Sequence, residues 1–102
     1  MQSTTKEQVV ERIRSSREQL SAFGVAGLGL FGSFARSEQN DESDIDILVD
    51  FEPGKKSFSN FMGLAFFLED LLGRQVDLVT RESLSRHIGP KILAEIEYGT
   101  LD

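Results

Sequence analysis

The spacing of apolar positions changes several times along the chain, and each change marks a predicted element. Near the start the spacing fits an amphipathic helix, with apolar residues at Val9, Ile13, Leu20 and Phe23. Thr4 followed by Glu7 has the form of a capping box, and Gly24 can end a helix. We therefore expect one helix from about Thr4 to Phe23.

Three later stretches are short, apolar and rich in branched side chains, as strands are, and they cover residues 25–31, 44–51 and 75–79. A short helix is expected at 34–36. A longer helix should begin after the N-cap Ser57 and end at Leu72, before Gly73. Residues 83–98 also have a helical pattern, interrupted by Gly89 and Pro90.

This order of helices and strands predicts an α/β (α+β) fold in which a small mixed sheet is flanked by helices. The 102 residues are enough for one hydrophobic core, so we expect residues 1–102 to form a single domain. A chain of this size has no room for a separate domain that binds a macromolecular acceptor. Such an acceptor would come from another chain.

Composition narrows the function classes. The formal net charge of -6 argues against direct binding to nucleic acid, which requires clustered Lys and Arg. Cysteine is absent, which excludes disulfides and thiolate metal sites. The start is polar and no apolar run is long enough to cross a bilayer, so we expect a soluble, cytoplasmic protein with no membrane contact.

Two acids lie on one face of the second predicted strand. Side chains alternate across a strand, so Asp44 and Asp46 point one way while Ile45 and Ile47 point the other way. Acids are depleted in strands, and burying an unpaired one is costly. A divalent cation is the natural compensation for this pair.

A third acid, Asp77, is flanked by apolar residues in the third predicted strand. If the two strands are neighbours in the right register, three carboxylates converge, and their repulsion requires cations between them. Mg²⁺ takes oxygen ligands and keeps positions for water and phosphate oxygens. Taken alone, Asp77 is more typical of a solvated strand edge.

Gly32 and Ser33 follow the first predicted strand. A glycine between a strand and a helix lets the backbone approach a phosphate, and the Ser33 hydroxyl can donate to it. Gly-Ser after a strand is most often only a turn. Combined with the three acids, however, it predicts a metal-dependent site where a nucleoside triphosphate is attacked in line and pyrophosphate leaves.

The pattern of Gly32, Ser33 and then Asp44-Ile45-Asp46 resembles the signature of the DNA polymerase β-like nucleotidyltransferase superfamily. The short length and the ending 76–84 are similar to its minimal nucleotidyltransferase (MNT) branch. The family usually has glycine where this chain has Ser37.

The resemblance implies a role for each candidate residue. Asp44 and Asp46 would bind two Mg²⁺ ions, and Asp77 would complete the metal ligands and help to deprotonate the acceptor. Gly32 and Ser33 would hold the triphosphate of the ATP substrate.

The MNT branch is commonly paired with HEPN-type toxins. The resemblance therefore implies an antitoxin that transfers AMP from ATP to a tyrosine hydroxyl of its partner. Two alternatives stay open: a catalytically silent antitoxin that neutralises the toxin by binding, and transfer to a small molecule such as an antibiotic.

Two further features concern the surface of the protein. The helix expected at 58–72 has a wider apolar surface than one core-facing stripe requires, which favours a core helix with an exposed margin over a partner interface. Lys55 and Lys56 follow a turn and are expected to be solvated, outside the site.

Overall fold

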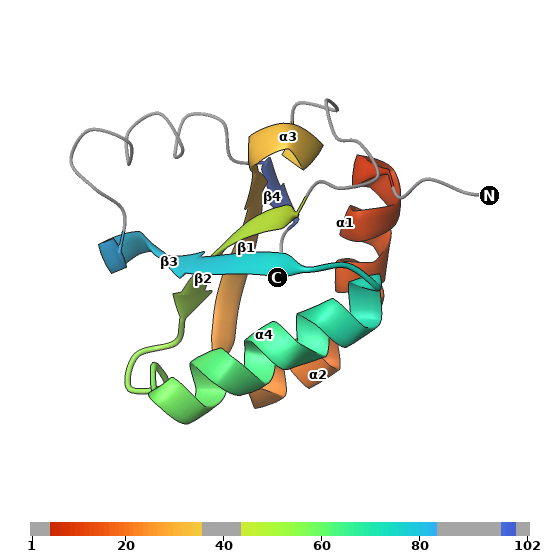
Figure 1. Ribbon diagram of the computed structural model, residues 1–102. Coiled ribbons are helices and arrows are strands. Elements are labelled where there is room, and N and C mark those ends of the chain that lie inside the picture. The colour runs from red at the N-terminus through yellow and green to blue at the C-terminus, as the bar shows by residue number, and fades with distance from the viewer. Residues whose placement is uncertain (1–4, 36–43, 84–96, 100–102) are drawn as a thin grey trace.

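The computed structural model describes residues 5–35, 44–83 and 97–99. In these residues the strands form one sheet in the order β3-β2-β1-β4 (Figure 1). The strands are β1 (Val25–Phe31), β2 (Ile45–Phe51), β3 (Val76–Thr80) and β4 (Glu97–Gly99). The first three confirm the predicted strands to within one residue at each end.

The sheet is mixed, as predicted. β1 pairs antiparallel with both β2 and β4, whereas β2 and β3 are parallel. Parallel neighbours need a long crossover, and here α4 (Phe58–Leu72) supplies it between β2 and β3. This crossover decides which residues of β2 and β3 lie side by side.

The first predicted helix is wrong in two respects. The chain forms two helices, α1 (Lys6–Ser15) and α2 (Arg17–Ala22), with a break at Ser16. The capping box is made by Thr5, whose hydroxyl accepts from the Gln8 N–H while the Gln8 side chain accepts from the Thr5 N–H, both at 3.1 Å. It is therefore shifted by one residue from the expected Thr4 and Glu7. The break allows apolar residues of both helices to reach the same core.

α4 confirms its prediction at both ends. The Asn60 N–H donates to the Ser57 hydroxyl at 3.1 Å, which caps the first turn. Gly73 follows the last residue with φ of 68°, a left-handed conformation that glycine adopts without strain.

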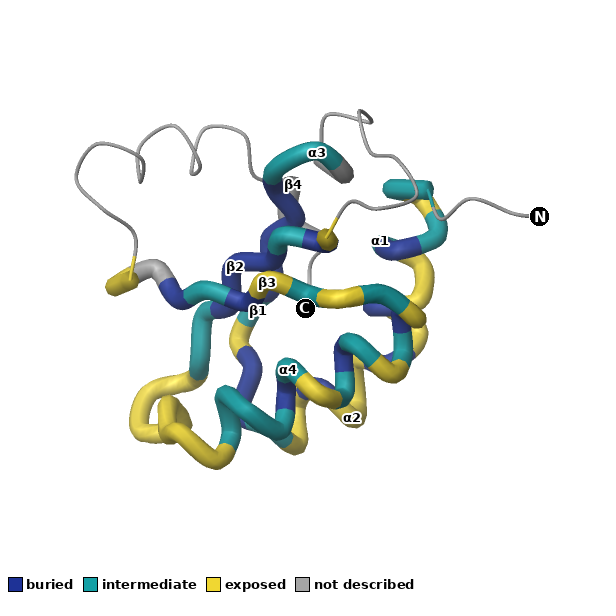
Figure 2. Tube along the Cα trace, in the orientation of Figure 1, coloured by how far each residue is buried: buried dark blue, intermediate teal, exposed yellow. Residues whose placement is uncertain are grey.

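The core lies between one face of the sheet and the helices α1, α2 and α4 (Figures 1 and 2). Every second residue of β2 points into it, and so do Val25, Leu28 and Leu30 of β1, where the register shifts between Val25 and Gly27. The fully buried side chains, at less than 2 % exposure or near it, include Leu28, Ile45, Ile47, Leu64 and Leu68. Phe23 of the α2 C-cap and Phe67 of α4 add a tilted ring contact, with centroids 5.7 Å apart.

The opposite face of the sheet carries the alternate residues. In β2 these are Asp46, Leu48 and Asp50, and Asp77 of β3 shares their face through its register with Asp46. The predicted acids are therefore on the face turned away from the three long helices.

The structure describes only parts of the two other expected helices, at 34–36 and 83–98. α3 (Gly32–Ala35) begins two residues before the expected short helix, and Arg36 with the loop 37–43 lies outside the described residues. Ser83 belongs to the short 3-10 helix η1 (Arg81–Ser83). Residues 97–98 are in strand β4, so the expected helix is wrong there, because pairing with β1 satisfies their backbone groups.

Residues 84–96 of that expected helix, with Gly89 and Pro90, also lie outside the described part of the chain. Among the helices that the structure describes, none has the length and apolar character needed to cross a membrane.

Candidate active site

The strand register places Asp46 and Asp77 next to each other. β2 and β3 are parallel, and Asp46 is paired with Asp77 across them. Paired residues of neighbouring strands point to the same face, with backbones about 4.8 Å apart. The structure thus brings together two of the three predicted carboxylates, which are 31 residues apart in sequence.

Asp44 lies just before β2, which begins at Ile45. It is two residues from Asp46 at the same end of the sheet, and its side chain is exposed. Asp77 is also exposed and Asp46 is half-buried. We call this end of the sheet, with Asp44, Asp46 and Asp77, the acidic edge. It is open to solvent and to a substrate.

Gly32 is in direct contact with the Asp46 side chain. β1 and β2 are antiparallel, and Phe31 pairs with Asp46, so the next residue, Gly32, comes beside the carboxylate. A Cβ at Gly32 would collide with the Asp46 carboxylate, and Gly32 has φ of 74°. Both facts favour glycine, because it alone has no side chain and adopts this φ freely. Gly32 is thus placed against the Asp46 carboxylate.

Ser33 follows Gly32 in α3 and is half-buried. The turn from β1 into α3 holds it close to the edge where Asp46 and Asp77 meet. It belongs to the same turn as Gly32, the residue that lies against Asp46.

The three acids fit hard divalent ions by the chemistry of their donor atoms. Carboxylate oxygens are the ligands of Mg²⁺, which usually takes one or two protein carboxylates and completes its shell with water and phosphate. Over residues 5–35, 44–83 and 97–99, no three acidic or histidine side chains form a ready-made metal-binding group. The metal roles of Asp44, Asp46 and Asp77 stay a prediction. Phosphate oxygens of the substrate would supply further ligands to the metal ions.

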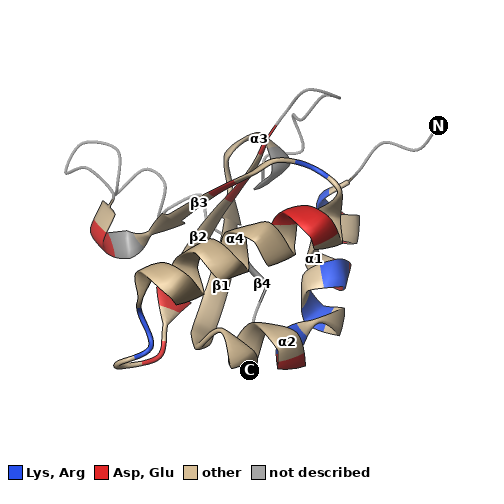
Figure 3. Cartoon of the chain, turned by 60° about the horizontal axis from the view of Figure 1, so that its bottom comes forward, with Lys and Arg blue, Asp and Glu red and all other residues tan. Residues whose placement is uncertain are grey.

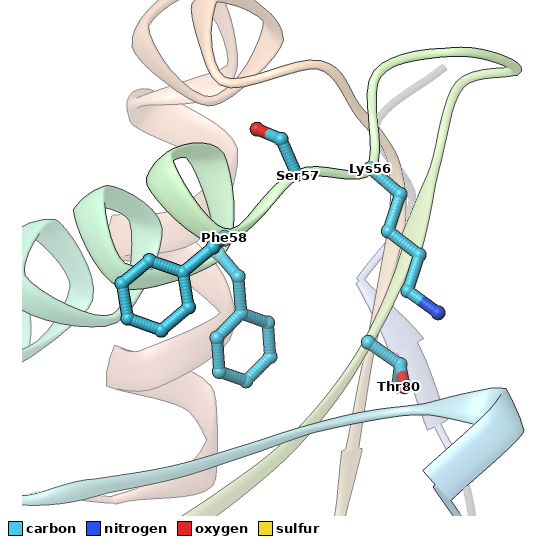
Figure 4. A pocket seen from close by; sticks show the side chains of 5 residues that line it. Lys56, Ser57, Phe58 and Thr80 are labelled. Carbon is cyan, nitrogen blue, oxygen red and sulfur yellow. The ribbon is translucent and has the colours of Figure 1, made fainter.

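A second concave region lies at the other end of the strands. A hollow of about 380 Å³ is lined by Lys56, Ser57, Phe58, Phe61 and Thr80 (Figure 4). Thr80 ends β3, whereas Asp77 is near its start, and Thr80 shares the helix-covered face with Leu78. This hollow is thus separate from the acidic edge. No periodic pattern in the sequence predicts this hollow.

The lysines beside this hollow behave as expected. Lys55 and Lys56 are exposed, and the Lys56 ammonium pairs with the Glu82 carboxylate at 3.1 Å. A hydrogen bond from its own backbone N–H lowers the pKa of Glu82 most, and the hydrogen bond from Lys56 lowers it further. Neither lysine belongs to the acidic edge.

Comparison with known proteins connects this arrangement to a family. The model of the nucleotidyltransferase domain family matches residues 10–101. The protein adenylyltransferase MntA of Thermococcus cleftensis is 40% identical over 99 residues, covering 96% of this chain and 99% of that protein.

Solved structures have the same fold. One is a crystal structure of a toxin-antitoxin with AMP-PNP, which has a TM-score of 0.66 at 23% identity and covers 94% of this chain and 73% of that chain. Another is a tri-AMPylated HEPN toxin of Shewanella oneidensis in complex with its MNT antitoxin, with a TM-score of 0.63 at 21% identity over 93% of this chain and 71% of that chain. The match over nearly the whole chain shows that it belongs to the nucleotidyltransferase family, in its minimal nucleotidyltransferase branch, and is a nucleotidyltransferase.

Proposed function

We propose that this chain is an antitoxin that transfers AMP from ATP to a tyrosine hydroxyl of a HEPN-type toxin. The observation that carries the proposal is the pairing of Asp46 with Asp77 across parallel strands, with Gly32 against the Asp46 carboxylate. The similarity to a named protein adenylyltransferase over almost the whole of both chains supports a protein acceptor. The solved toxin-antitoxin complexes with this fold suggest that the acceptor protein is a toxin.

Each candidate residue has a role in this reaction. The backbone of Gly32 and the hydroxyl of Ser33 hold the triphosphate, because the elbow between β1 and α3 has no side chain in the way at Gly32. Asp44, Asp46 and Asp77 would hold two Mg²⁺ ions, which stabilise the entering and leaving oxygens. Asp77 is exposed on β3 and would accept the proton of the acceptor hydroxyl.

The proposed step is a displacement at the α-phosphorus of ATP. The acceptor oxygen forms a bond to this phosphorus, and the bond from the α-phosphorus to the bridging oxygen breaks. Pyrophosphate leaves with the bonding electrons, and the hydroxyl proton passes to Asp77. A protein acceptor needs no direct contact with nucleic acid or a membrane, and the need for ATP agrees with a cytoplasmic site.

The test is transfer to a candidate HEPN partner, followed by mass spectrometry of that partner with ATP and Mg²⁺ present. We expect the wild-type chain to add AMP, and we expect Asp46→Asn and Asp77→Asn to slow transfer by about a hundredfold or more. Losses of this size follow removal of one group that stabilises charge in a transition state. Asp50→Asn is the matched control, because Asp50 is on the same face of β2 at its far end.

Two outcomes would contradict the proposal. A partner that stays unmodified with wild type, while its toxicity is still neutralised, would favour a silent antitoxin that acts by binding. Equal loss in Asp50→Asn would show that the substitutions act on folding, which circular dichroism of each variant checks independently.

A further inference from the structure

The outer side of α4 carries a stripe of apolar side chains that are exposed in the described part of the chain. Phe58 is 82% exposed and Phe66 is 64% exposed, although both are large and hydrophobic. Met62 lies between them and is half-exposed. The three are four residues apart, which places them along one side of a helix. Large contiguous apolar patches mark interaction sites more often than single exposed residues do.

The stripe is distinct from the side of α4 that packs on the sheet. Leu64, Leu68 and Leu72 face the core and are at most 1% exposed. Phe58, Met62 and Phe66 do not belong to the core or to the partly buried residues packed against it in the described part of the chain. Figure 1 shows α4 at the margin of the molecule, with the sheet on one side only.

The hollow described above lies at the N-terminal end of this stripe. Phe58 and Phe61 form its apolar wall, and Figure 4 shows the Phe58 ring on the same side of the hollow as Lys56 and Thr80. Its volume of about 380 Å³ is ample for an aromatic side chain. The stripe thus has a hollow at one end and a protruding ring, Phe66, toward the other.

Charge is distributed unevenly along the same helix. Lys55 and Lys56 precede α4, Glu69 and Asp70 are in its last turn, and the residues 57–68 between them carry no charge. Figure 3 shows this as a tan helix with blue before it and red at its far end. A surface with one sign at each end complements a copy of itself turned by 180°.

We infer that a second copy of this chain packs its α4 antiparallel against this stripe in a symmetric dimer. The two-fold axis passes near Met62, so Phe66 of each copy faces the hollow beside Phe58 of the other. Lys55 of each copy then lies near Asp70 of the other. Both copies contribute the same surface to the interface, so the assembly ends at two copies. The acidic edge with Asp46 and Asp77 is on the other face of the sheet and stays open in both copies.

The first test is the mass of the wild-type chain in solution, measured by sedimentation over a wide range of concentration. We expect a dimer that dissociates on dilution. Phe66→Glu should weaken it roughly a hundredfold or more, because a buried aromatic anchor is lost twice. Gln19→Glu adds the same charge at an exposed position of α2 and should leave the dimer unchanged.

The second test asks whether the helices are antiparallel. Lys55→Glu and Asp70→Lys should each weaken the dimer, and the double variant should recover most of the wild-type affinity. The chain has no cysteine, so Met62→Cys gives one thiol per copy, and a short bis-maleimide should link two copies through it. Gln19→Cys is the control and should not be linked.

Several results would overturn the inference. A wild-type chain that is monomeric at every concentration would do so, and so would a dimer that survives Phe66→Glu. Failure of the double charge variant to recover affinity would exclude the antiparallel arrangement. Phe66 points away from the core, so circular dichroism should show that these variants remain folded.

Discussion

At the scale of single residues, Gly32 shows how one missing side chain can build a site. It has a positive φ, and the Asp46 carboxylate occupies the space that a Cβ would need. The glycine therefore permits the backbone turn and also leaves room for the Asp46 carboxylate. This double demand explains why Gly-Ser at this position is more informative than an ordinary turn.

We predict that Gly32→Ala will lower the free energy of unfolding more than Gly54→Ala. Both glycines have φ between 70° and 80°, so alanine costs about 1–2 kcal/mol of backbone strain at either position. Only at Gly32 would the new Cβ also displace a carboxylate, because nothing lies within 4 Å at Gly54. Urea unfolding measures the difference in stability.

Calorimetry with Mg²⁺ and ATP completes this comparison. Gly32→Ala should also weaken nucleotide binding, while Gly54→Ala should retain it. Equal effects of the two variants on both stability and binding would show that the contact with Asp46 is unimportant.

At the scale of elements, the ends of α4 follow from local chemistry. The Ser57 hydroxyl satisfies a backbone N–H that has no partner within the helix, and Gly73 supplies a left-handed residue at the other end. Both signals are readable in sequence, which is why the bounds of this helix could be predicted. The break at Ser16 is harder to predict: Ser16 is the N-cap of α2, but its side chain makes no capping hydrogen bond.

We expect Ser57→Ala to reduce the free energy of unfolding by about 1 kcal/mol, the usual cost of losing an N-cap. Ser59→Ala is the control, because Ser59 is exposed in the first turn of the same helix, and it should change stability by less than about 0.5 kcal/mol. The two variants are compared by urea unfolding. If both lose the same stability, the cap bond to Asn60 contributes nothing of its own.

At the scale of the whole molecule, the Lys56–Glu82 pair joins the segment before α4 to the short helix η1 that follows β3. The partners are 26 residues apart in sequence and 3.1 Å apart in space. Glu82 has a lowered pKa, so its contribution to stability is present above the ordinary carboxyl pKa and is lost as pH falls through the lowered value. Both side chains are exposed, so this contribution is small.

We predict that Lys56→Gln will raise the pKa of Glu82 only part of the way to its ordinary value. The larger cause of the lowering is a backbone hydrogen bond, which this variant retains. Titration of the Glu82 carboxyl by NMR measures the change, with Lys55→Gln as the control. An unchanged Glu82 pKa in Lys56→Gln would mean that the ion pair does not form in solution.

Most of the elements and the chemical candidates could be predicted from local pattern, although the first helix was expected to be continuous and is broken at Ser16. Alternation placed Asp44 and Asp46 on one face, the cap residues bounded α4, and the joint motif indicated a nucleotidyltransferase. Local pattern did not predict strand β4 at 97–99, because that strand exists only through its pairing with β1.

Tertiary structure alone decided which distant residues meet. The parallel crossover through α4 sets Asp77 beside Asp46, and the antiparallel turn from β1 sets Gly32 against the Asp46 carboxylate. It also left Phe58 and Phe66 uncovered on α4, where sequence favoured a core helix with only an exposed margin. The physical reason is that register and burial are set by long-range packing, which no short window of the chain contains.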